Sequence, residues 1–295
     1  MLSVCIPVYN FDVTKLVKNI LQQADVANIN IEILIGDDSS TNKYNNKNLE
    51  NGDKVKYIYN KQNLGRSKNR NQLAEKAIFS NLLFIDCDAQ IKSKSFLSFY
   101  IASIVQKQKV VCGGTAYTKK KQAKNHTLHW KYGTKVEAKS IEERKKTPNK
   151  SFSSFNFLIE KELFLSIKFN ETLTEYGHED TLFGYELKKQ GITITQIDNP
   201  LIHTGIEENR VFIEKSLVGI NNLIYIIKNI ENSKELISDI KLLEFYRTLK
   251  KKKALTFLKI FYPLLFPLSK FILINIAQNI TLFNFLKILY FTKKY

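Results

Sequence analysis

The sequence has few of the residues that mark several common protein classes. Its 295 residues include three cysteines, five prolines and one tryptophan. Because Cys5, Cys87 and Cys112 are odd in number, widely spaced and inside apolar runs, they predict buried thiols rather than a disulfide framework. The N-terminus lacks the basic start, longer apolar segment and cleavage site of a secretory signal. We therefore expect a cytoplasmic protein.

Two nucleotide-binding signatures are also missing. No Gly-x-Gly-x-x-Gly follows the first apolar run, and no Gly-x-x-x-x-Gly-Lys-[Ser/Thr] occurs. The sequence thus lacks the dinucleotide fingerprint and the P-loop, whose backbone amides cradle phosphates. If the protein binds phosphate, a metal ion is one remaining way to hold it.

Acidic residues are scarce relative to basic ones. The formal net charge is +17, and residues 245–295 contain ten Lys or Arg and no Asp or Glu. An anionic partner is expected near that end. A nucleic-acid-binding protein is one alternative, but the charge gathers near an apolar tail rather than along a groove-reading motif, so we expect no nucleic-acid partner.

Strand-like and helix-like patterns alternate over the first two thirds of the chain. Apolar runs at 3–8, 31–36, 55–59 and 82–85 are separated by helical spacings such as that over 14–24. This alternation predicts an α/β fold with a doubly wound, mostly parallel sheet and helices on both faces. We place one domain at residues 1–210 and a basic, helical C-terminal region at residues 211–295.

Two carboxylates follow the most apolar of these strands. Leu82 to Ile85 is an uninterrupted apolar run, typical of a strand buried on both faces, and Asp86 and Asp88 come directly after it. Ligands of open α/β sheets bind beyond the carboxyl ends of the strands, and Mg²⁺ or Mn²⁺ prefers oxygen ligands. The alternative is a turn with two solvated aspartates.

A second acidic pair, Glu179 and Asp180, stands where a helical pattern begins. Acidic residues in a first turn are favoured by the helix dipole, which is one interpretation. The other is that one carboxylate, directed at a cleft, acts as a general base. Further along, His203 ends a strand-like run and is either a satisfied histidine or a metal ligand.

The segment from Lys119 to Lys150 carries eleven Lys or Arg against three Glu. It is interpreted either as a solvated, mobile loop or as a segment that closes over an anionic ligand, with Trp130 stacking on a sugar. His126 and His129 have no cysteine or carboxylate nearby to complete a zinc site.

These pieces, in this order and spacing, resemble the inverting family 2 glycosyltransferases of the GT-A fold over roughly residues 1 to 205. The matching stretches are 3–10, Asp37 to Ser40, Asn63 to Gly65 with Arg70, the Asp86-Cys87-Asp88 motif, and Tyr176 to Asp180, which is similar to the Glu-Asp motif of galactosyltransferase-like members.

The resemblance implies a role for each matching residue. Pro7, Tyr9, Asp38, Arg70 and Asp86 would bind the donor nucleotide. Mn²⁺ or Mg²⁺ would be held by Asp88, Asp86 and His203, although Glu207 and Glu208 offer competing oxygens. Asp180 would be the catalytic base and Glu179 would position the acceptor hydroxyl.

The same resemblance implies an activity. We expect a sugar to pass from a nucleotide sugar, in particular a UDP-sugar, to a saccharide or lipid-linked saccharide during assembly of surface polysaccharide, lipopolysaccharide or glycans. The Gln-x-x-Arg-Trp motif of processive members is missing, which favours a single transfer. A sugar-phosphate nucleotidyltransferase is the rival enzyme, but its Gly-rich phosphate loop is absent.

The C-terminal region combines apolar and basic residues. Amphipathic helices are expected over 212–228 and 235–249. The longest uncharged run after them, Phe271 to Leu286, has 16 residues and four amides, which is short and polar for a membrane span of about 20 residues. We expect helices that lie on an anionic membrane, on the inner face of the cell membrane. A packed helical subdomain or a homodimer surface is the alternative.

Overall fold

The computed structural model describes residues 1–42, 44–230, 236 and 240–295. The described residues form two compact units. The first contains residues 1–118, 137–174 and 179–205, and the second contains residues 119–136, 175–178 and 206–295. The chain enters the second unit for the last time at residue 206, after two earlier excursions at residues 119–136 and 175–178.

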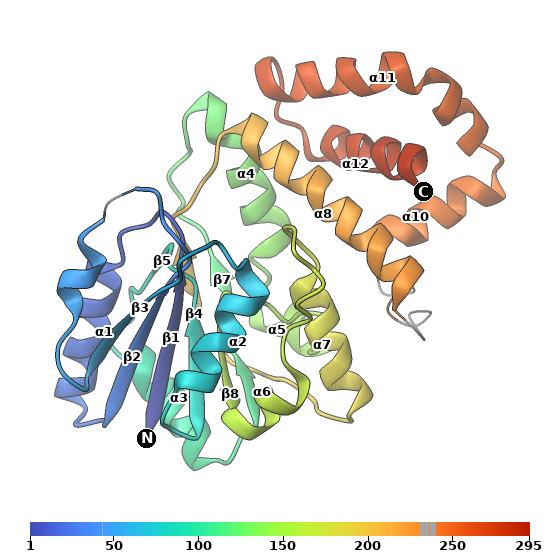
Figure 1. The fold of residues 1–295 in the computed structure, drawn as a ribbon. Helices are drawn as coiled ribbons and strands as arrows, with labels where there is room; N and C mark the ends of the chain where they lie inside the picture. Colours follow the sequence, from blue (N-terminus) through green and yellow to red (C-terminus); the bar gives the residue numbers. More distant parts are fainter. Residues whose placement is uncertain (43, 231–235, 237–239) are drawn as a thin grey trace. The chain divides into compact units, whose positions relative to one another are not determined.

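A seven-stranded sheet forms the centre of the first unit (Figure 1). Its strands lie in the order β3-β2-β1-β4-β8-β6-β9. They are β1 (Leu2–Val8), β2 (Ile31–Asp37), β3 (Val55–Tyr59), β4 (Asn81–Ile85), β6 (Val110–Cys112), β8 (Asn156–Glu160) and β9 (Thr195–Gln196). β8 is antiparallel to β4 and β6, and the other neighbours are parallel. The expected mostly parallel α/β sheet is confirmed.

Helices cover both faces of this sheet because its side chains alternate between them (Figure 1). Val4 and Ile6 share a core with α1 and α3, whereas Cys5 shares one with α2, α6 and α7. The helices are α1 (Thr14–Val26), α2 (Arg66–Lys76), α3 (Phe96–Val105), α5 (Ile141–Lys146), α6 (Lys161–Ile167) and α7 (Glu179–Lys189), and a 3₁₀-helix spans Asn45–Leu49. All four residues of the run Leu82 to Ile85 in β4 are fully buried, as the apolar pattern predicted.

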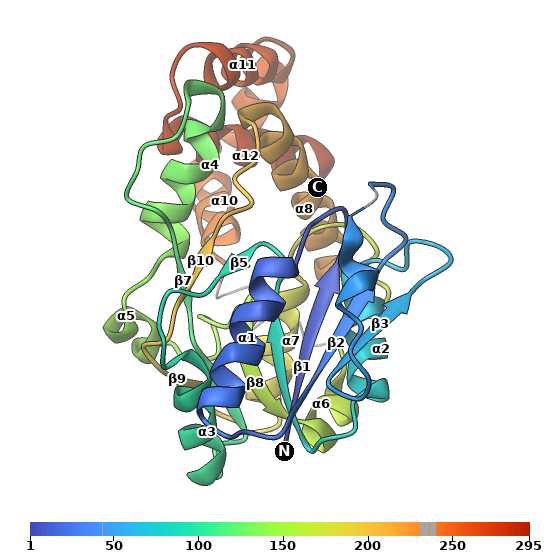
Figure 2. The same ribbon diagram turned by 90° about the vertical axis from the view of Figure 1, so that its left-hand side faces the viewer.

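A small three-stranded sheet, β5-β10-β7, also belongs to the first unit (Figure 2). It consists of β5 (Ala89–Gln90), β7 (Thr115–Ala116) and β10 (Leu201–His203). β10 runs antiparallel to β5, with His203 opposite Ala89. This register joins two segments that are more than 100 residues apart in the sequence.

The segment from Lys119 to Lys150 is not the open loop that its charge suggested. It contains a 3₁₀-helix (Lys124–His126), α4 (Thr127–Tyr132), a π-helix (Gly133–Glu137) and α5. Leu128 is fully buried, and the Ser140 side chain and Glu143 form a reciprocal capping box at the start of α5. Local capping and a few apolar anchors therefore order a segment whose composition is mostly charged.

The helices α4, α8 (Asn209–Asn229), α10 (Lys241–Lys251), α11 (Leu255–Asn275) and α12 (Ile280–Lys294) share the core of the second unit, which includes Leu128, Phe212 and Phe283. The helix expected over 212–228 is present within α8. Residues 235 and 237–239 of the second expected helix lie outside the described residues, and its residues 241–249 form part of α10.

The C-terminal apolar sequence divides differently from our expectation. The uncharged run from Phe271 to Leu286 is split between α11 and α12, because α11 ends at Asn275 and α12 begins at Ile280. α11 has the length and composition to cross a membrane, with a mean hydropathy of 1.7 over its most apolar 18-residue window, of which 17% is buried. The search for a long uncharged run did not identify this helix, because Lys259 and Lys270 interrupt its apolar sequence.

Candidate active site

Polar side chains gather beyond the carboxyl ends of β1, β2 and β4. β1 lies between β2 and β4, where the order of the parallel strands reverses, and ligands of open α/β sheets bind at such a point. Pro7 and Tyr9 stand at the end of β1, and the Tyr9 side chain is 49% exposed. Tyr9 is exposed and Pro7 is half-buried at the edge of the sheet where we expect a nucleotide, and their contact with it stays a prediction.

Asp38, just after β2, holds the loop that leads into α2. Its carboxylate accepts hydrogen bonds from Asn60 Nδ2 at 3.1 Å, from the Leu64 amide at 2.8 Å and from the Gly65 amide at 2.9 Å. A carboxylate offers about four lone-pair positions, so most of its accepting capacity is used within the chain. Asp38 thus shapes the entrance to α2, and its contact with a nucleotide base stays a prediction.

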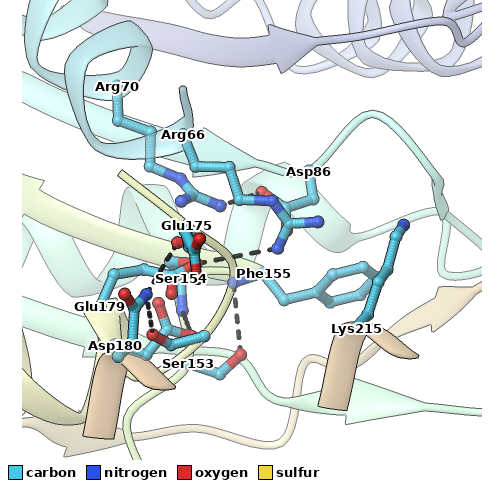
Figure 3. Close-up of polar contacts among 12 residues, drawn as sticks. Arg66, Arg70, Asp86, Ser153, Ser154, Phe155, Glu175, Glu179, Asp180 and Lys215 are labelled. Carbon is cyan, nitrogen blue, oxygen red and sulfur yellow. Dashed lines mark hydrogen bonds and ion pairs between the residues drawn. The ribbon is translucent and has the colours of Figure 1, made fainter. Parts of the chain in front are cut away.

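Arg70 reaches from α2 to Asp86 at the end of β4 (Figure 3). Arg70 is 2% exposed, and its Nη2 donates to Asp86 Oδ1 at 2.6 Å. Burial opposes the charge, but Asp86, with help from Asp180 and Glu179, holds the pKa of Arg70 above its ordinary value. Because Arg70 is buried behind Asp86, the structure supports a positioning role for it; direct contact with a nucleotide stays a prediction.

Asp88 and His203 are brought together by the small sheet. The antiparallel register of β5 and β10 sets His203 opposite Ala89, and Thr204 donates its amide and hydroxyl to the Asp88 carbonyl at 2.9 Å and 2.6 Å. His203 Nε2 then lies 3.1 Å from Asp88 Oδ2. Burial favours the neutral form of each group, but their interaction outweighs it, so the pKa of His203 is raised and that of Asp88 is lowered.

The Asp88 carboxylate lies against the bare Cα of Gly205, where an added Cβ would overlap Oδ2. The two donor groups suit a divalent cation, since carboxylate oxygen and imidazole nitrogen are both ligands of Mn²⁺. Asp88 Oδ2 and His203 Nε2 are 3.1 Å apart, so both atoms would be within reach of one such ion.

Among the described residues, no group of three or more His, Cys, Asp and Glu side chains is arranged to hold a metal. Asp86 is engaged by Arg70, and the Glu207 carboxylate pairs with Lys215. Asp88 and His203 would supply two ligands, and water and a ligand's oxygens would supply the rest, as is usual for Mg²⁺ bound with phosphates; their role as metal ligands stays a prediction.

Glu179 and Asp180 open α7, as their position in the sequence predicted. Asp180 Oδ2 accepts from the Ser154 amide at 3.0 Å, and Glu179 Oε1 lies 3.7 Å from Arg66 Nη1 (Figure 3). Asp180 Oδ1 and Glu179 Oε2 are buried and have no hydrogen-bond partner in the part of the chain that the structure describes. An unsatisfied buried carboxylate oxygen is costly, which makes it available to a donor group of a ligand.

The electrostatics of this pair suit proton transfer. Burial, followed by the charge of Glu179, raises the pKa of Asp180 to about 6, against the opposing effects of Arg70 and Ser154. A base whose pKa lies near the working pH is both ionised and able to hold a proton. The geometry therefore supports Asp180 as a general base.

Three contributors to the site were not identified from the sequence. Arg66, on α2, pairs with Glu179; the Ser154 amide, just before β8, orients Asp180; and Gly205 makes room beside Asp88. Arg66 had a visible signal, because it follows the Asn63-Leu64-Gly65 stretch and lies one helical turn before Arg70. The contributions of the Ser154 amide and of Gly205 cannot be recognised from a single sequence, because they depend on backbone position and not on residue type or spacing.

His126 and His129 lie in the second unit and serve its packing. His126 Nδ1 is 3.1 Å from the Ile206 carbonyl, and His129 Nδ1 accepts from the Glu207 amide at 2.9 Å. The His129 ring stacks on Phe212 with centroids 4.3 Å apart. These contacts explain the two histidines as structural residues.

Comparison with known proteins decides the family. The sequence profile described as Glycosyl transferase family 2 matches residues 3–167, more than half of the chain. The chain belongs to this family. It is a glycosyltransferase, and its fold is the GT-A fold that the sequence motifs predicted. A search of curated proteins found no match.

Solved structures share the fold of this glycosyltransferase at low sequence identity. S. aureus TarS 1-349 in complex with UDP is 16% identical, with a TM-score of 0.54 over 99% of this chain and 90% of that one. Mannosyltransferase PcManGT from Pyrobaculum calidifontis, in complex with GDP-Man and Mn²⁺, is 12% identical, with a TM-score of 0.62 over 99% of this chain and 85% of that one.

A longer TarS chain from S. aureus is 18% identical, with a TM-score of 0.52 over 81% of this chain. The match covers 42% of that protein's length. The glycosyltransferase described here thus corresponds to less than half of the longer relative.

Proposed function

We propose that this glycosyltransferase moves a sugar from a nucleotide sugar, in particular a UDP-sugar, to a hydroxyl group of a saccharide or lipid-linked saccharide, with inversion at the anomeric carbon. The observation that carries the proposal is a pair of charged clusters with different chemistry in one unit. Asp86, Asp88 and His203 suit a donor diphosphate with its cation, and Glu179 and Asp180 suit an acceptor. Arg70 interacts electrostatically with both Asp86 and Asp180 and so links the clusters.

On the donor side, the chain's own residues bind and orient the nucleotide. Tyr9 and Pro7 present an accessible surface at the end of β1 for a base, and Asp86, fixed by Arg70, faces the same strand ends. Asp88 and His203 would hold Mn²⁺ or Mg²⁺. Such an ion, when bound, acts as a Lewis acid that stabilises negative charge on a departing nucleoside diphosphate.

On the acceptor side, Asp180 receives the proton. The acceptor oxygen forms a bond to the anomeric carbon while the bond from that carbon to the diphosphate oxygen breaks, and its electron pair leaves with the nucleoside diphosphate. The hydroxyl proton passes to Asp180 and then to solvent. Glu179 positions the hydroxyl, and its negative charge keeps the pKa of Asp180 high enough to accept the proton.

Two structural relatives support the choice of donor and cofactor. TarS 1-349 was solved with UDP and PcManGT with GDP-Man and Mn²⁺. The lack of the Gln-x-x-Arg-Trp motif favours one transfer per encounter, and assembly of surface polysaccharide, lipopolysaccharide or glycans is the setting that we propose.

Calorimetric titration with UDP, with and without Mn²⁺, tests the donor site. Wild-type protein should bind UDP in an Mn²⁺-dependent manner, and Asp88→Ala should lose that dependence because one of the two protein ligands is gone. Asp198→Ala, at an exposed aspartate in the same unit, is the matched control and should bind as wild type does. Equal Mn²⁺-dependent affinity in Asp88→Ala and Asp198→Ala would contradict the assignment.

If UDP does not bind, the same titration with GDP, CMP and dTDP decides between another nucleotide and none. Binding of one of these would replace uridine in the proposal and leave the mechanism standing. Failure of all four would remove the nucleotide-sugar proposal.

A further inference from the structure

A stripe of large apolar side chains runs along the exposed side of α11. Its members recur every three or four residues and therefore share one helix face. They are Phe257, Ile260, Phe261, Leu264, Leu268 and Phe271. Ile260 is 67% exposed and Leu264 is 62% exposed, so the stripe is open to solvent rather than covered by the described chain.

The opposite side of α11 is fixed within the second unit. Leu258, Ser269 and Leu273 are buried, and Leu273 belongs to the core that α11 shares with α8 and α12. Tyr262 and Phe266 stack on each other, and Phe266 also contacts Tyr290 of α12. Turning the stripe inward would remove these contacts, so the apolar face is a fixed outer surface of α11. Large exposed apolar patches of this kind mark interaction sites.

Positive charge lies at both ends of the stripe. Lys250 to Lys253, which are exposed, precede α11, and Lys259 is exposed in its first turns. Beyond the other end, Gln278 of the turn between α11 and α12 lines a cavity of about 490 Å³ together with Lys121, Lys124 and Lys131. Residues 245–295 contain no acidic residue, and Lys270 of α11 pairs with Glu214 of α8 at 3.4 Å.

An apolar stripe between two basic groups matches the boundary of an anionic bilayer, where acyl chains lie beside phosphates. Although the length and composition of α11 would allow it to cross a bilayer, the positions of its two lysines oppose a crossing. Ten residues separate Lys259 from Lys270, a length of roughly 15 Å in a helix. The hydrocarbon core is about 30 Å thick, so a crossing helix would place at least one lysine inside it.

We propose that α11 lies in the plane of an anionic lipid surface, with its six apolar side chains among the upper acyl chains and the flanking lysines on the headgroup phosphates. This interaction goes beyond the transfer reaction and does not depend on it. It gives a physical form to the membrane association expected from the sequence, and it would hold the enzyme at the surface where a lipid-linked acceptor resides.

Flotation of the full-length protein with vesicles tests the proposal. Wild-type protein should float with vesicles of phosphatidylcholine and phosphatidylglycerol at about 7:3 and should remain in solution with phosphatidylcholine alone. The variant Ile260→Ser/Leu264→Ser/Leu268→Ser should reduce the bound fraction at least about tenfold, since it removes apolar contact area. The variant Lys250→Gln/Lys251→Gln/Lys252→Gln should bind the anionic vesicles more weakly than wild-type protein does, because it removes positive charge near the headgroups.

The matched control is Val26→Ser/Ile78→Ser/Val105→Ser, which removes three similarly exposed apolar side chains from the first unit. It should float as wild type does, which separates loss of a specific surface from a general loss of surface hydrophobicity. Circular dichroism should show all variants folded, because the replaced side chains are exposed. Unchanged flotation of the α11 variant, or equal loss in the control, would overturn the proposal.

Two further outcomes would also overturn it. If wild-type protein resists extraction by alkaline carbonate, α11 is embedded as a span rather than lying at the interface. If the protein sediments as a dimer without vesicles, and the α11 substitutions dissociate it while vesicle binding is absent, the stripe binds a second copy of the chain. Release by carbonate and by high salt, from a monomeric protein, supports the proposal.

Discussion

Arg70, which is buried, and Asp86, which is partly exposed, form an ion pair whose Nη2 and Oδ1 atoms are 2.6 Å apart. Arg70 also influences Asp180, whose pKa it lowers, and its guanidinium lies 5.4 Å from the centre of the Phe169 ring. One cation from α2 thus stabilises Asp86, which we propose to act on the donor side, and lowers the pKa of Asp180, the proposed base. The pair connects the two halves of the proposed reaction without itself reacting.

Removing Arg70 should be costly because it leaves buried carboxylates without their cation. We expect Arg70→Gln to lower the free energy of unfolding by about 3 kcal/mol, and Asp86→Asn to lower it by less. The double variant should lose less than the sum of the two, since each single change already breaks the same pair. Urea denaturation measures all three.

Lys54→Gln provides the comparison, because it breaks the exposed Lys54–Asp25 pair, whose cost should be below about 1 kcal/mol. If Arg70→Gln proves no more destabilising than Lys54→Gln, the pair is not the structural link described above.

Asp180→Asn should stabilise the fold while abolishing transfer. The folded protein raises the pKa of Asp180 from 3.8 to about 6, so the charged form is disfavoured in the folded state. Stability therefore falls as the pH rises from about 4 through 6, and the full cost, on the order of 3 kcal/mol, applies above pH 7. Thermal unfolding at pH 8 should show a higher midpoint for the variant, with little difference near pH 4.

Asp198→Asn, at an exposed position, should leave both the midpoint and the activity unchanged. UDP binding by Asp180→Asn should match wild type, since the role proposed for Asp180 concerns the acceptor. A variant that still transfers sugar at the wild-type rate would exclude Asp180 as the base.

The pH dependence of transfer should report the same group. Because the base must be ionised, kcat/KM should fall tenfold per pH unit below about pH 6. Glu179→Gln should move this acidic limb to lower pH, because it removes the neighbouring negative charge that helps to raise the pKa of Asp180.

Glu186→Gln on the same helix, whose carboxylate pairs with Lys189, should leave the limb in place. If the acidic limb of the pH profile does not move in Glu179→Gln, the limb reports the titration of a group other than Asp180.

Much of the fold could be predicted from the sequence, because its central strands are buried on both faces and therefore form continuous apolar runs. The apolar run from Leu82 to Ile85 predicted β4, and with it the position of Asp86 and Asp88 after a strand end. The acidic first turn predicted that α7 begins near Glu179. Local patterns of this kind depend on nearest neighbours along the chain, which a single sequence shows directly.

The segment from Lys119 to Lys150 was harder to predict, because average charge outweighed its few informative residues. Ser140 and Glu143 carried the spacing of a capping box, which correctly indicates the start of α5. The burial of Leu128 depends on a core shared with Phe212 and Phe283, more than 80 residues away. Such long-range packing leaves no periodic trace in a mostly charged segment.

The proximity of Asp88 and His203 was predicted from the resemblance to a family and not from a hydrophobic pattern in the sequence. It follows from a register between β5 and β10, strands of two and three residues that are too short to show alternation. The space left by Gly205 depends on the same pairing. A site that depends on the pairing of such short strands can therefore be recognised in the structure but not in the sequence pattern.

Gly205→Ala tests that geometry without changing any charge. The added methyl group would overlap Asp88 Oδ2, so the carboxylate must rotate away from His203 Nε2 and the two proposed ligands would separate. We expect Mn²⁺-dependent UDP affinity to fall at least about tenfold, because ligand positions must be held within a few tenths of an ångström, while affinity without metal stays unchanged. Gly219→Ala, where a Cβ would meet its neighbours at ordinary distances of 3.4 Å or more, should bind UDP with Mn²⁺ as wild type does. If Gly205→Ala keeps full Mn²⁺ dependence, the cation is held away from Asp88 Oδ2, and the search for its ligands would move to Asp86, whose second carboxylate oxygen would then have to serve.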